Sequence, residues 1–392
     1  MKALPFSSLS AFLLAACILI ICGSAPMLPA QAVPSSAMKI AELRKAVPCA
    51  TSLHNGEKLE WYDARELVVE GRGWTDTETF FERLPARAKP GLTPAVRNLC
   101  ANSAGIVVRF VTDAPKIYAD WTTTGFSMHH MAPSGIRGLD LYSRRGERWV
   151  FEGIGRPLDE HTTATIGTFM PPMPAEPTEF MLYLPLYDAT KDLRIAVAAG
   201  SLMALPVARP AERARPIVFY GTSITQGGCA SRSGMAHPAI LGRWLDREVI
   251  NIGFSGAGKM EPEMAALLAE LDPALYVLEC LPNLNADMVA KQVTLFVHTL
   301  RAAHPETPIL LVENPIRPET NTGNAELRKA YSALLAENIP HLHYLPGEGQ
   351  FHGPEHGTVD GVHPTDLGFL RLAQFYSPVL SRILGQPLPS GE

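Results

Sequence analysis

Two patterns of hydrophobic and polar residues divide the chain near residue 206. Upstream of this point, short apolar runs alternate with polar positions and end at Gly, Pro or Asp residues. The clearest runs are 67–71, 106–111, 117–121, 148–151, 179–184 and 192–197. Alternation with a period of two indicates strands with one buried face, and no long helical period interrupts them. The pattern therefore predicts an antiparallel β-sandwich of jelly-roll type over residues 49–205.

Downstream of this point, buried strands alternate with amphipathic helices. Strands are predicted at 217–220, 248–252, 275–281, 309–313 and 342–345. Helices are predicted near 238–246, 262–271, 286–303, 324–337 and 366–384. Pro238 and Pro262 stand in the first turns of two of these helices, where the missing N–H of proline costs nothing. This alternation predicts a doubly wound parallel sheet with helices on both faces over residues 216–387. The polar, proline-bearing residues 206–215 have the composition of a linker.

The first 32 residues have the pattern of a secretory signal peptide. Lys2 precedes an apolar run at 11–21, and Ala-Gln-Ala ending at Ala32 is a small-residue cleavage site. We expect cleavage after Ala32, a mobile tail at 33–48 and an exported protein, periplasmic or extracellular, without stable membrane insertion. The alternative is a lipoprotein anchor at the Leu-Ala-Ala-Cys box ending at Cys17, although apolar rather than polar residues follow it. No later apolar run is long enough to span a bilayer.

The composition argues against a nucleic-acid partner, but it does not decide whether the cysteines form disulfides. The chain has 392 residues and a formal net charge of −5, so it lacks the basic footprint of a nucleic-acid-binding protein. Four cysteines follow the predicted cleavage site, and export permits disulfides. The pairs Cys49–Cys100 and Cys229–Cys280 would each stay within one predicted domain. The alternative is four free, buried thiols.

Candidate chemistry begins at Ser223, directly after the predicted strand 217–220. Gly221 permits a sharp exit from that strand, which leaves the serine at the carboxyl edge of the sheet, where ligands bind in open α/β folds. A serine there is a nucleophile when a base reaches it and N–H groups surround the developing oxyanion. The alternative is a serine that caps a helix.

Three further stretches with candidate residues also follow predicted strands. Gly256 lies in a Gly-rich turn after 248–252 and can present a bare backbone N–H, and the Asn283 amide can donate a hydrogen bond to an oxyanion. Asp360 and His363 are three residues apart, so an aspartate can hold the imidazole tautomer while the other ring nitrogen takes a proton. The alternatives are a plain turn for the glycine and helix caps for the others.

These four blocks together resemble the SGNH hydrolases, the superfamily of GDSL-type esterases and lipases, over residues 216–385. This chain has Gly-Thr-Ser-Ile at 221–224 where the family name implies Gly-Asp-Ser-Leu. It also has Leu-Pro-Asn at 281–283 where Gly-x-Asn-Asp is common. Neither change removes a reacting group, but both place the chain in a divergent branch.

The resemblance implies a three-layer, flavodoxin-like fold and a role for each matched residue. Ser223 corresponds to the nucleophile, and Asp360 and His363 correspond to the acid and base of the catalytic triad. The oxyanion hole corresponds to the backbone N–H groups of Ser223 and Gly256 and the side chain of Asn283. No metal or cofactor is required by such a reaction.

A second resemblance lies upstream. Gly-Leu-Asp-Leu-Tyr at 138–142 is similar to the Gly-x-Asp-Leu-Tyr motif of β-rich domains that precede bacterial SGNH hydrolases. Arg-Leu-Pro-Ala at 83–86 and Ser-Ala-Gly-Ile at 103–106 fit the same domain. We expect the motif to be a packing element rather than part of the reaction.

Taken together, the sequence predicts a secreted serine esterase that hydrolyses O-acyl esters, foremost O-acetyl groups on carbohydrate. The expected partner is a small-molecule or polysaccharide ester, and the oligomeric state is left open. A short-chain lipid ester hydrolase and a glycan-binding protein without turnover are the alternatives. Four tryptophans have two possible roles, stacking on sugar rings or core packing: Trp61, Trp74, Trp121 and Trp149.

Other titratable residues have more than one interpretation. The His129–His130 pair either covers the catalytic cleft or forms a simple turn. His352 and His356 have metal-ligand spacing, but their Gly/Pro-rich surroundings favour a solvated loop beside the active site over a metal site.

Two glutamates at strand ends, Glu279 and Glu313, either bind a substrate hydroxyl or pair with an arginine.

Overall fold

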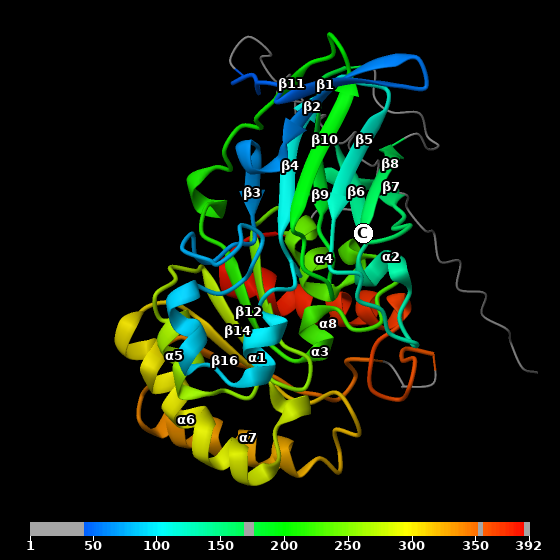
Figure 1. Cartoon of the computed structure of the whole chain (residues 1–392). Coiled ribbons are helices and arrows are strands. Elements are labelled where there is room, and N and C mark those ends of the chain that lie inside the picture. The colour runs from blue at the N-terminus through cyan, green and yellow to red at the C-terminus, as the bar shows by residue number, and fades with distance from the viewer. Residues whose placement is uncertain (1–42, 168–175, 352–355, 388–392) are drawn as a thin grey trace, which may run out of the picture. The chain divides into compact units, whose positions relative to one another are not determined.

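The alternating strands of the first half of the chain form two antiparallel sheets. The computed structural model describes residues 43–167, 176–351 and 356–387, so the predicted signal peptide at 1–32 lies outside the described residues. One sheet has the strand order β1-β2-β10-β5-β8. The other has the order β11-β4-β9-β6-β7, with β3 also paired to β4 (Figure 1).

Six of these strands, β3, β4, β5, β7, β9 and β10, lie at the predicted apolar runs, and the other five were not among those runs. The first sheet contains β1 (Ala50–His54), β2 (Glu57–Asp63), β5 (Ile117–Thr122), β8 (His161–Gly167) and β10 (Asp192–Ala198). The second contains β3 (Val68–Glu70), β4 (Val107–Thr112), β6 (Leu139–Arg145), β7 (Arg148–Gly155), β9 (Thr178–Tyr183) and β11 (Met203–Ala204). Short helices join them: η2 (Ala64–Glu66), η3 (Ala86–Gly91), α1 (Pro94–Leu99) and α2 (Pro133–Ile136).

Both sheets contribute to one hydrophobic core. Trp121 and Ile195 of the first sheet and Phe110 and Phe180 of the second belong to the same buried cluster. The rings of Phe110 and Phe180 stack with their centroids 5.6 Å apart. Apolar faces of two sheets packed on one another make a sandwich, so the predicted antiparallel sandwich is confirmed.

The second half of the chain contains a five-stranded parallel sheet with the order β13-β12-β14-β15-β16. Its strands are β12 (Ile217–Gly221), β13 (Val249–Gly253), β14 (Leu275–Glu279), β15 (Ile309–Val312) and β16 (Leu342–Leu345). All four neighbouring pairs are parallel. The order reverses beside β12, which is the topology of a doubly wound sheet, and that prediction is also confirmed.

Helices cover both faces of this sheet because successive strand residues point to opposite sides. Val218 and Tyr220 of β12 pack in the cluster with α5, α6 and α7, whereas Ile217 and Phe219 pack in the cluster with α4 and α8 (Figure 1). The helices are α4 (His237–Trp244), α5 (Pro262–Leu268), α6 (Ala286–Ala303), α7 (Thr322–Ala336) and α8 (Asp366–Leu384). Among the described residues, none of these helices combines the length and the hydrophobicity needed to cross a bilayer.

The second sheet of the sandwich packs against α4. Tyr142, Tyr183 and Ala239 belong to one buried cluster that joins β6, β9 and α4. The guanidinium of Arg243 lies 4.0 Å from the ring centroid of Tyr142 and 5.4 Å from that of Tyr183. These cation–π contacts link the strand that carries the Gly-x-Asp-Leu-Tyr motif to the α/β half of the chain.

The two segments predicted as tail and linker make specific contacts. The backbone N–H of Ala46 donates to the carbonyl of Met203 at 2.9 Å, so the described end of the predicted tail is paired with β11. In the predicted linker, Arg209 forms an ion pair with Glu70. Arg247 donates to the carbonyl of Arg215 at 2.7 Å.

The four cysteines of the described residues are all free thiols, three of them buried and Cys49 exposed. The predicted pairs Cys49–Cys100 and Cys229–Cys280 are therefore wrong. An exposed Cys49 cannot meet a Cys100 that lies in the interior cluster with α5 and α6.

A buried arginine joins the two halves of the chain. Arg83, which is 1% exposed, donates from Nη1 to the carbonyls of Gly253 at 2.6 Å and Asn251 at 3.3 Å. Its Nε and Nη2 donate to the carbonyls of Asn102 and Leu99 at 2.8 and 2.6 Å. Burial lowers the pKa of Arg83 to about 10, so the guanidinium stays charged at neutral pH and all four carbonyls receive charge-assisted hydrogen bonds.

We expect Arg83→Met to lower the free energy of unfolding by about 3 kcal/mol, because it leaves buried carbonyls without partners. Chemical denaturation followed by tryptophan fluorescence measures this change. Arg87→Met is the matched control, since the ion pairs of Arg87 with Asp76 and Glu270 lie at the exposed surface, where solvent screens them, and their loss should lower the free energy of unfolding much less. Equal losses in the two variants would contradict the role given to Arg83.

Candidate active site

A tight turn places Ser223 at the carboxyl end of β12. β12 ends at Gly221, and α3 (Ser223–Gln226) begins two residues later. Thr222 caps α3: its hydroxyl accepts from the N–H of Ile224, and the hydroxyl of Thr225 accepts from the N–H of Thr222. A side chain at Gly221 would come within 1.9 Å of the Thr225 hydroxyl, so the turn requires glycine. Because Thr222 is the cap, Ser223 does not have the capping role considered for it.

The structure brings Ser223, His363 and Asp360 together in one line of hydrogen bonds. The Oγ of Ser223 lies 2.9 Å from Nε2 of His363, and Nδ1 of His363 lies 2.7 Å from Oδ2 of Asp360. A carboxylate can only accept, so Nδ1 carries the proton and Nε2 accepts from the serine hydroxyl. This is the arrangement in which a serine gives its proton to histidine.

The carboxylate of Asp360 is fixed by its own neighbours in the chain. Its Oδ1 accepts from the backbone N–H groups of His363 at 2.8 Å and Val362 at 3.0 Å. Partial burial alone would raise the pKa of Asp360, but these bonds and the imidazole of His363 outweigh it and lower the pKa to about 2. The residue is therefore ionised at neutral pH and ready to stabilise a protonated imidazole.

Gly256 and Asn283 meet on the loop that follows β13. Residues 254–258 form a turn in which Gly256 has a φ of +66°, and a side chain there would point into open space. Asn283 ends η6 (Leu281–Asn283), and its Nδ2 lies 3.4 Å from the carbonyl of Phe254 and 3.3 Å from that of Gly258. Both contacts are long for hydrogen bonds, so the amide rests against the turn and holds it weakly.

Gln226 connects this glycine turn to the serine. It lies three residues after Ser223 in α3, and its Oε1 accepts from the backbone N–H of Ser255 at 3.0 Å. Its Nε2 donates to the carbonyl of Leu186 at 3.0 Å, so a segment before the parallel sheet contributes to the same region. Sequence reasoning missed Gln226, although its place three residues after the candidate serine could have singled it out.

Residues of the first half of the chain also reach the site. The hydroxyl of Tyr187 donates to the carbonyl of Ser223 at 3.2 Å. The ring of His130 lies 5.8 Å from the ring of His363, centroid to centroid. The sequence singled out the His129–His130 pair as a possible cover of the cleft, and this contact puts His130 beside the imidazole; nothing in the sequence marked Tyr187.

The Gly-x-Asp-Leu-Tyr motif holds the loop after α3. Asp140, which is fully buried, accepts from Nη1 of Arg232 at 2.8 Å and from the backbone N–H of Gly234 at 2.7 Å. Ser231 in the same loop donates its N–H to Asp366 at 2.9 Å. Asp366 is the first residue of α8 and lies three residues after His363, so the motif supports the site without touching the reacting groups.

Several other candidates have structural partners instead. Glu279 accepts from Tyr376 at 2.8 Å and contacts Nε2 of His237 at 3.0 Å in the interior. Glu313 pairs with Arg328 at 2.7 Å, which matches the arginine alternative. Four tryptophans are buried, as core packing requires: Trp61, Trp74, Trp121 and Trp149.

Of the possible metal pair His352 and His356, His352 lies outside the described residues. His356 uses its backbone carbonyl to accept from the hydroxyl of Thr365 at 3.2 Å.

Comparison with family models matches both halves of the chain. Residues 214–381 match the GDSL-like lipase/acylhydrolase family. Residues 59–203 match the N-terminal region of SGNH-hydrolase-type esterases, which is named for its GxDLY motif. A comparison with curated proteins gave no match.

Solved structures resemble the described fold. A protein of Bacteroides ovatus, assigned as a GDSL-like lipase, is 35% identical with a TM-score of 0.78, and the match covers 85% of this chain and 100% of that one. The salicylyl-acyltransferase SsfX3 of a tetracycline biosynthetic pathway is 17% identical with a TM-score of 0.63, covering 88% and 96%. A family two carbohydrate esterase of Cellvibrio japonicus is 14% identical with a TM-score of 0.56, covering 86% and 99%.

The lowered pKa of Asp360 gives a measurable pH dependence. Because its folded value lies below the usual 3.8, any stability that the ionised carboxylate contributes is fully present above that pH. It is lost as the pH falls toward about 2. We expect the carboxyl ¹³C shift of Asp360, assigned with Asp360→Asn, to show no titration step above about pH 3. A midpoint at or above 3.8 would show that the hydrogen bonds to Asp360 do not form.

Proposed function

Because the chain belongs to the GDSL-like lipase and acylhydrolase family of SGNH hydrolases and is an esterase, we propose that Ser223 is its nucleophile. The observation that carries the proposal is the unbroken line of hydrogen bonds from Ser223 through His363 to Asp360. Ser223 is 7% exposed while His363 and Asp360 are more open, so a substrate carbonyl reaches the hydroxyl from the side of the imidazole.

The proposed reaction is acyl transfer to water. The Oγ of Ser223 attacks the ester carbonyl while Nε2 of His363 takes the hydroxyl proton. Asp360 stabilises the imidazolium that forms, and His363 then passes the proton to the leaving alcohol. A water molecule, deprotonated by His363, attacks the acyl-serine and releases the acid.

The oxyanion of each tetrahedral intermediate needs donors that are already in place. The proposed donors are the backbone N–H groups of Ser223 and Gly256 and the Nδ2 of Asn283. The left-handed turn at Gly256 supports this, because a Cβ at this position would have no neighbour within 4 Å and the turn is therefore open on that side. The weak contacts of Asn283 Nδ2 with the turn leave its protons available to a stronger acceptor.

For the substrate we propose O-acetyl esters of carbohydrate. A neighbour with the same two-part fold is named as a carbohydrate esterase, which supports a sugar-bound ester. Because that neighbour is only 14% identical, the similarity is one of fold. The experiment below therefore identifies the acyl group and the sugar.

We expect the protein to release acetate from acetylated xylan and simple acetyl sugars and to cleave p-nitrophenyl acetate faster than long-chain nitrophenyl esters. Ser223→Ala should lose this turnover by at least about 10³-fold while it unfolds at the wild-type temperature, because the nucleophile is gone and the fold is not. Acetate release and nitrophenol absorbance measure the two activities.

Ser233→Ala is the matched control for this variant. Ser233 is a buried serine on the neighbouring loop, and its hydroxyl has no hydrogen-bond partner within the described ranges, so its loss should leave turnover near wild type. A fully active Ser223→Ala protein would refute the nucleophile. Cleavage of long-chain esters alone would replace the carbohydrate substrate with a lipid, and glycan binding without turnover would replace the enzyme with a binding protein.

We further propose that the protein is exported after cleavage following Ala32. The support is the charged start, the apolar run and the small-residue site of the first 32 residues. N-terminal sequencing of the protein secreted from a bacterial host should begin at Val33. A start at Cys17 with a bound lipid would instead establish the lipoprotein anchor.

A further inference from the structure

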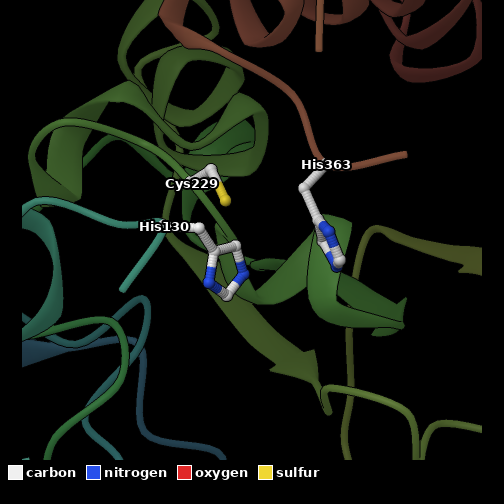
Figure 2. A group of neighbouring side chains, drawn as sticks. All are labelled: His130, Cys229 and His363. Atoms are coloured by element: carbon white, nitrogen blue, oxygen red, sulfur yellow. The ribbon is translucent and has the colours of Figure 1, made fainter. Parts of the chain in front are cut away.

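A cluster of metal-binding side chains lies beside the proposed nucleophile. His130, Cys229 and His363 each offer one nitrogen or sulfur atom, and these atoms all lie within 4.8 Å of one another. Figure 2 shows the sulfur of Cys229 and the two imidazole rings facing a common space. Within the described ranges, these residues form the one group of three or more His, Cys, Asp or Glu side chains with such spacing.

The three residues come from separate segments that the fold holds together. His130 lies between β5 and α2, Cys229 follows α3, and His363 precedes α8. Their convergence therefore depends on the packing of both halves of the chain and cannot arise from local sequence spacing.

The loop that carries His130 is fixed at both ends. On one side, the N–H groups of Thr124 and Phe126 donate to the buried carboxylate of Asp188 at 3.0 and 2.9 Å. On the other side, the hydroxyl of Ser134 donates to the carbonyl of Ser231 at 2.6 Å. His130 is thus held at the site before any ligand arrives.

His130 carries an unused ligand atom. Its Nδ1 is buried and has no hydrogen-bond partner in the part of the chain that the structure describes. A buried ring nitrogen ordinarily has a partner, since the desolvated polar atom otherwise costs free energy. In Figure 2 the other ring nitrogen faces Cys229 and His363, so a cation bound among the three residues would supply that partner after a flip of the imidazole ring.

Cys229 has a backbone conformation that its residue type disfavours. Its φ is +76°, in the left-handed region where non-glycine residues are uncommon, although Gly227 and Gly228 stand directly before it. Strain of this kind tends to persist at functional sites. Here it accompanies a thiol, 8% exposed, whose sulfur lies near both imidazoles.

We propose that His130, Cys229 and His363 bind a soft divalent cation, for which Zn²⁺ is the best match, and that the bound cation blocks the esterase site. Two imidazole nitrogens and a thiolate are the donors that Zn²⁺ prefers, and a water completes a tetrahedral set. With Zn–N near 2.0 Å and Zn–S near 2.3 Å, tetrahedral donors lie roughly 3.3–3.8 Å apart. Side-chain movements of about 1 Å would bring the three ligand atoms from their present spacing into that range.

Binding at this site uses the histidine that the reaction needs. Nδ1 of His363 bonds to Asp360 and Nε2 bonds to Ser223, so a metal on either nitrogen breaks one of these two bonds. The thiol of Cys229 releases its proton to solvent as it becomes a ligand. The inhibitory consequence alone rests on the proposed function; the binding itself does not.

Titration of the full chain with Co²⁺, a spectroscopic substitute for Zn²⁺, tests the binding directly. We expect one equivalent to produce thiolate-to-cobalt charge-transfer absorption, which Zn²⁺ removes by displacement and Mg²⁺ does not. Cys229→Ala should abolish the band, and Cys49→Ala is the matched control because it removes an exposed thiol elsewhere and should keep it. Absence of the band in the wild type, or its persistence in Cys229→Ala, would overturn the proposal. Cys229→Gly, which suits the left-handed φ, replaces Cys229→Ala if that variant fails to fold.

Inhibition gives a second, separate readout. Zn²⁺ should inhibit ester hydrolysis reversibly, with EDTA restoring the rate. Loss of a residue that merely orients a ligand already costs about 10–100-fold in metal affinity. His130→Ala should therefore raise the half-inhibitory Zn²⁺ concentration by more than about tenfold. Inhibition of each variant is measured against the rate of that variant without Zn²⁺. Unchanged Zn²⁺ sensitivity in both His130→Ala and Cys229→Ala would reject the site. If no ester is hydrolysed at all, the proposed function fails while the cobalt titration still decides the metal site.

Discussion

The buried guanidinium of Arg83 is the interaction on which the relation between the two halves of the chain depends. A charge taken out of water is tolerated when hydrogen bonds replace its hydration, and Arg83 donates four of them to backbone carbonyls from both halves. Two of them, Asn251 and Gly253, belong to the end of β13, directly before the turn that holds Gly256. The sandwich half of the chain therefore helps to fix the loop that carries Gly256, a proposed oxyanion donor.

The other contacts between the halves reach different loops of the same site. Asp140 holds the segment after α3 through Arg232 and Gly234, and Tyr187 reaches the carbonyl of Ser223 itself. Each of these side chains is buried and satisfied by groups on the opposite half, so displacing one half from the other would leave several polar groups unpaired at once. The α/β half accordingly has the form of a catalytic scaffold whose loops are completed by the sandwich.

The fold was predictable from the sequence wherever burial followed a regular period. Helices 286–303 and 366–384 and strand 342–345 match α6, α8 and β16 residue for residue, because their apolar positions face a core. Two of the strands that the pattern missed lack that signal. β1 is largely exposed, and β8 is rich in threonine, so neither shows a clean alternation. The disulfide pairs failed for a different reason, since cysteine count and export say nothing about which thiols approach each other.

The site divides in the same way into local and non-local parts. Asp360 binds the backbone N–H and the ring of His363 across three residues, so its spacing in the sequence was enough to predict the contact. The approach of His363 to Ser223 spans 140 residues and depends on the pairing of Ser231 with Asp366 at the start of α8. His130 and Cys229 come from segments with no motif in common, and only the packed chain reveals that they flank the same imidazole. A site assembled in this manner brings the sandwich half into contact with His363, the proposed general base, which is where a bound cation or a neighbouring side chain would act on the proposed reaction.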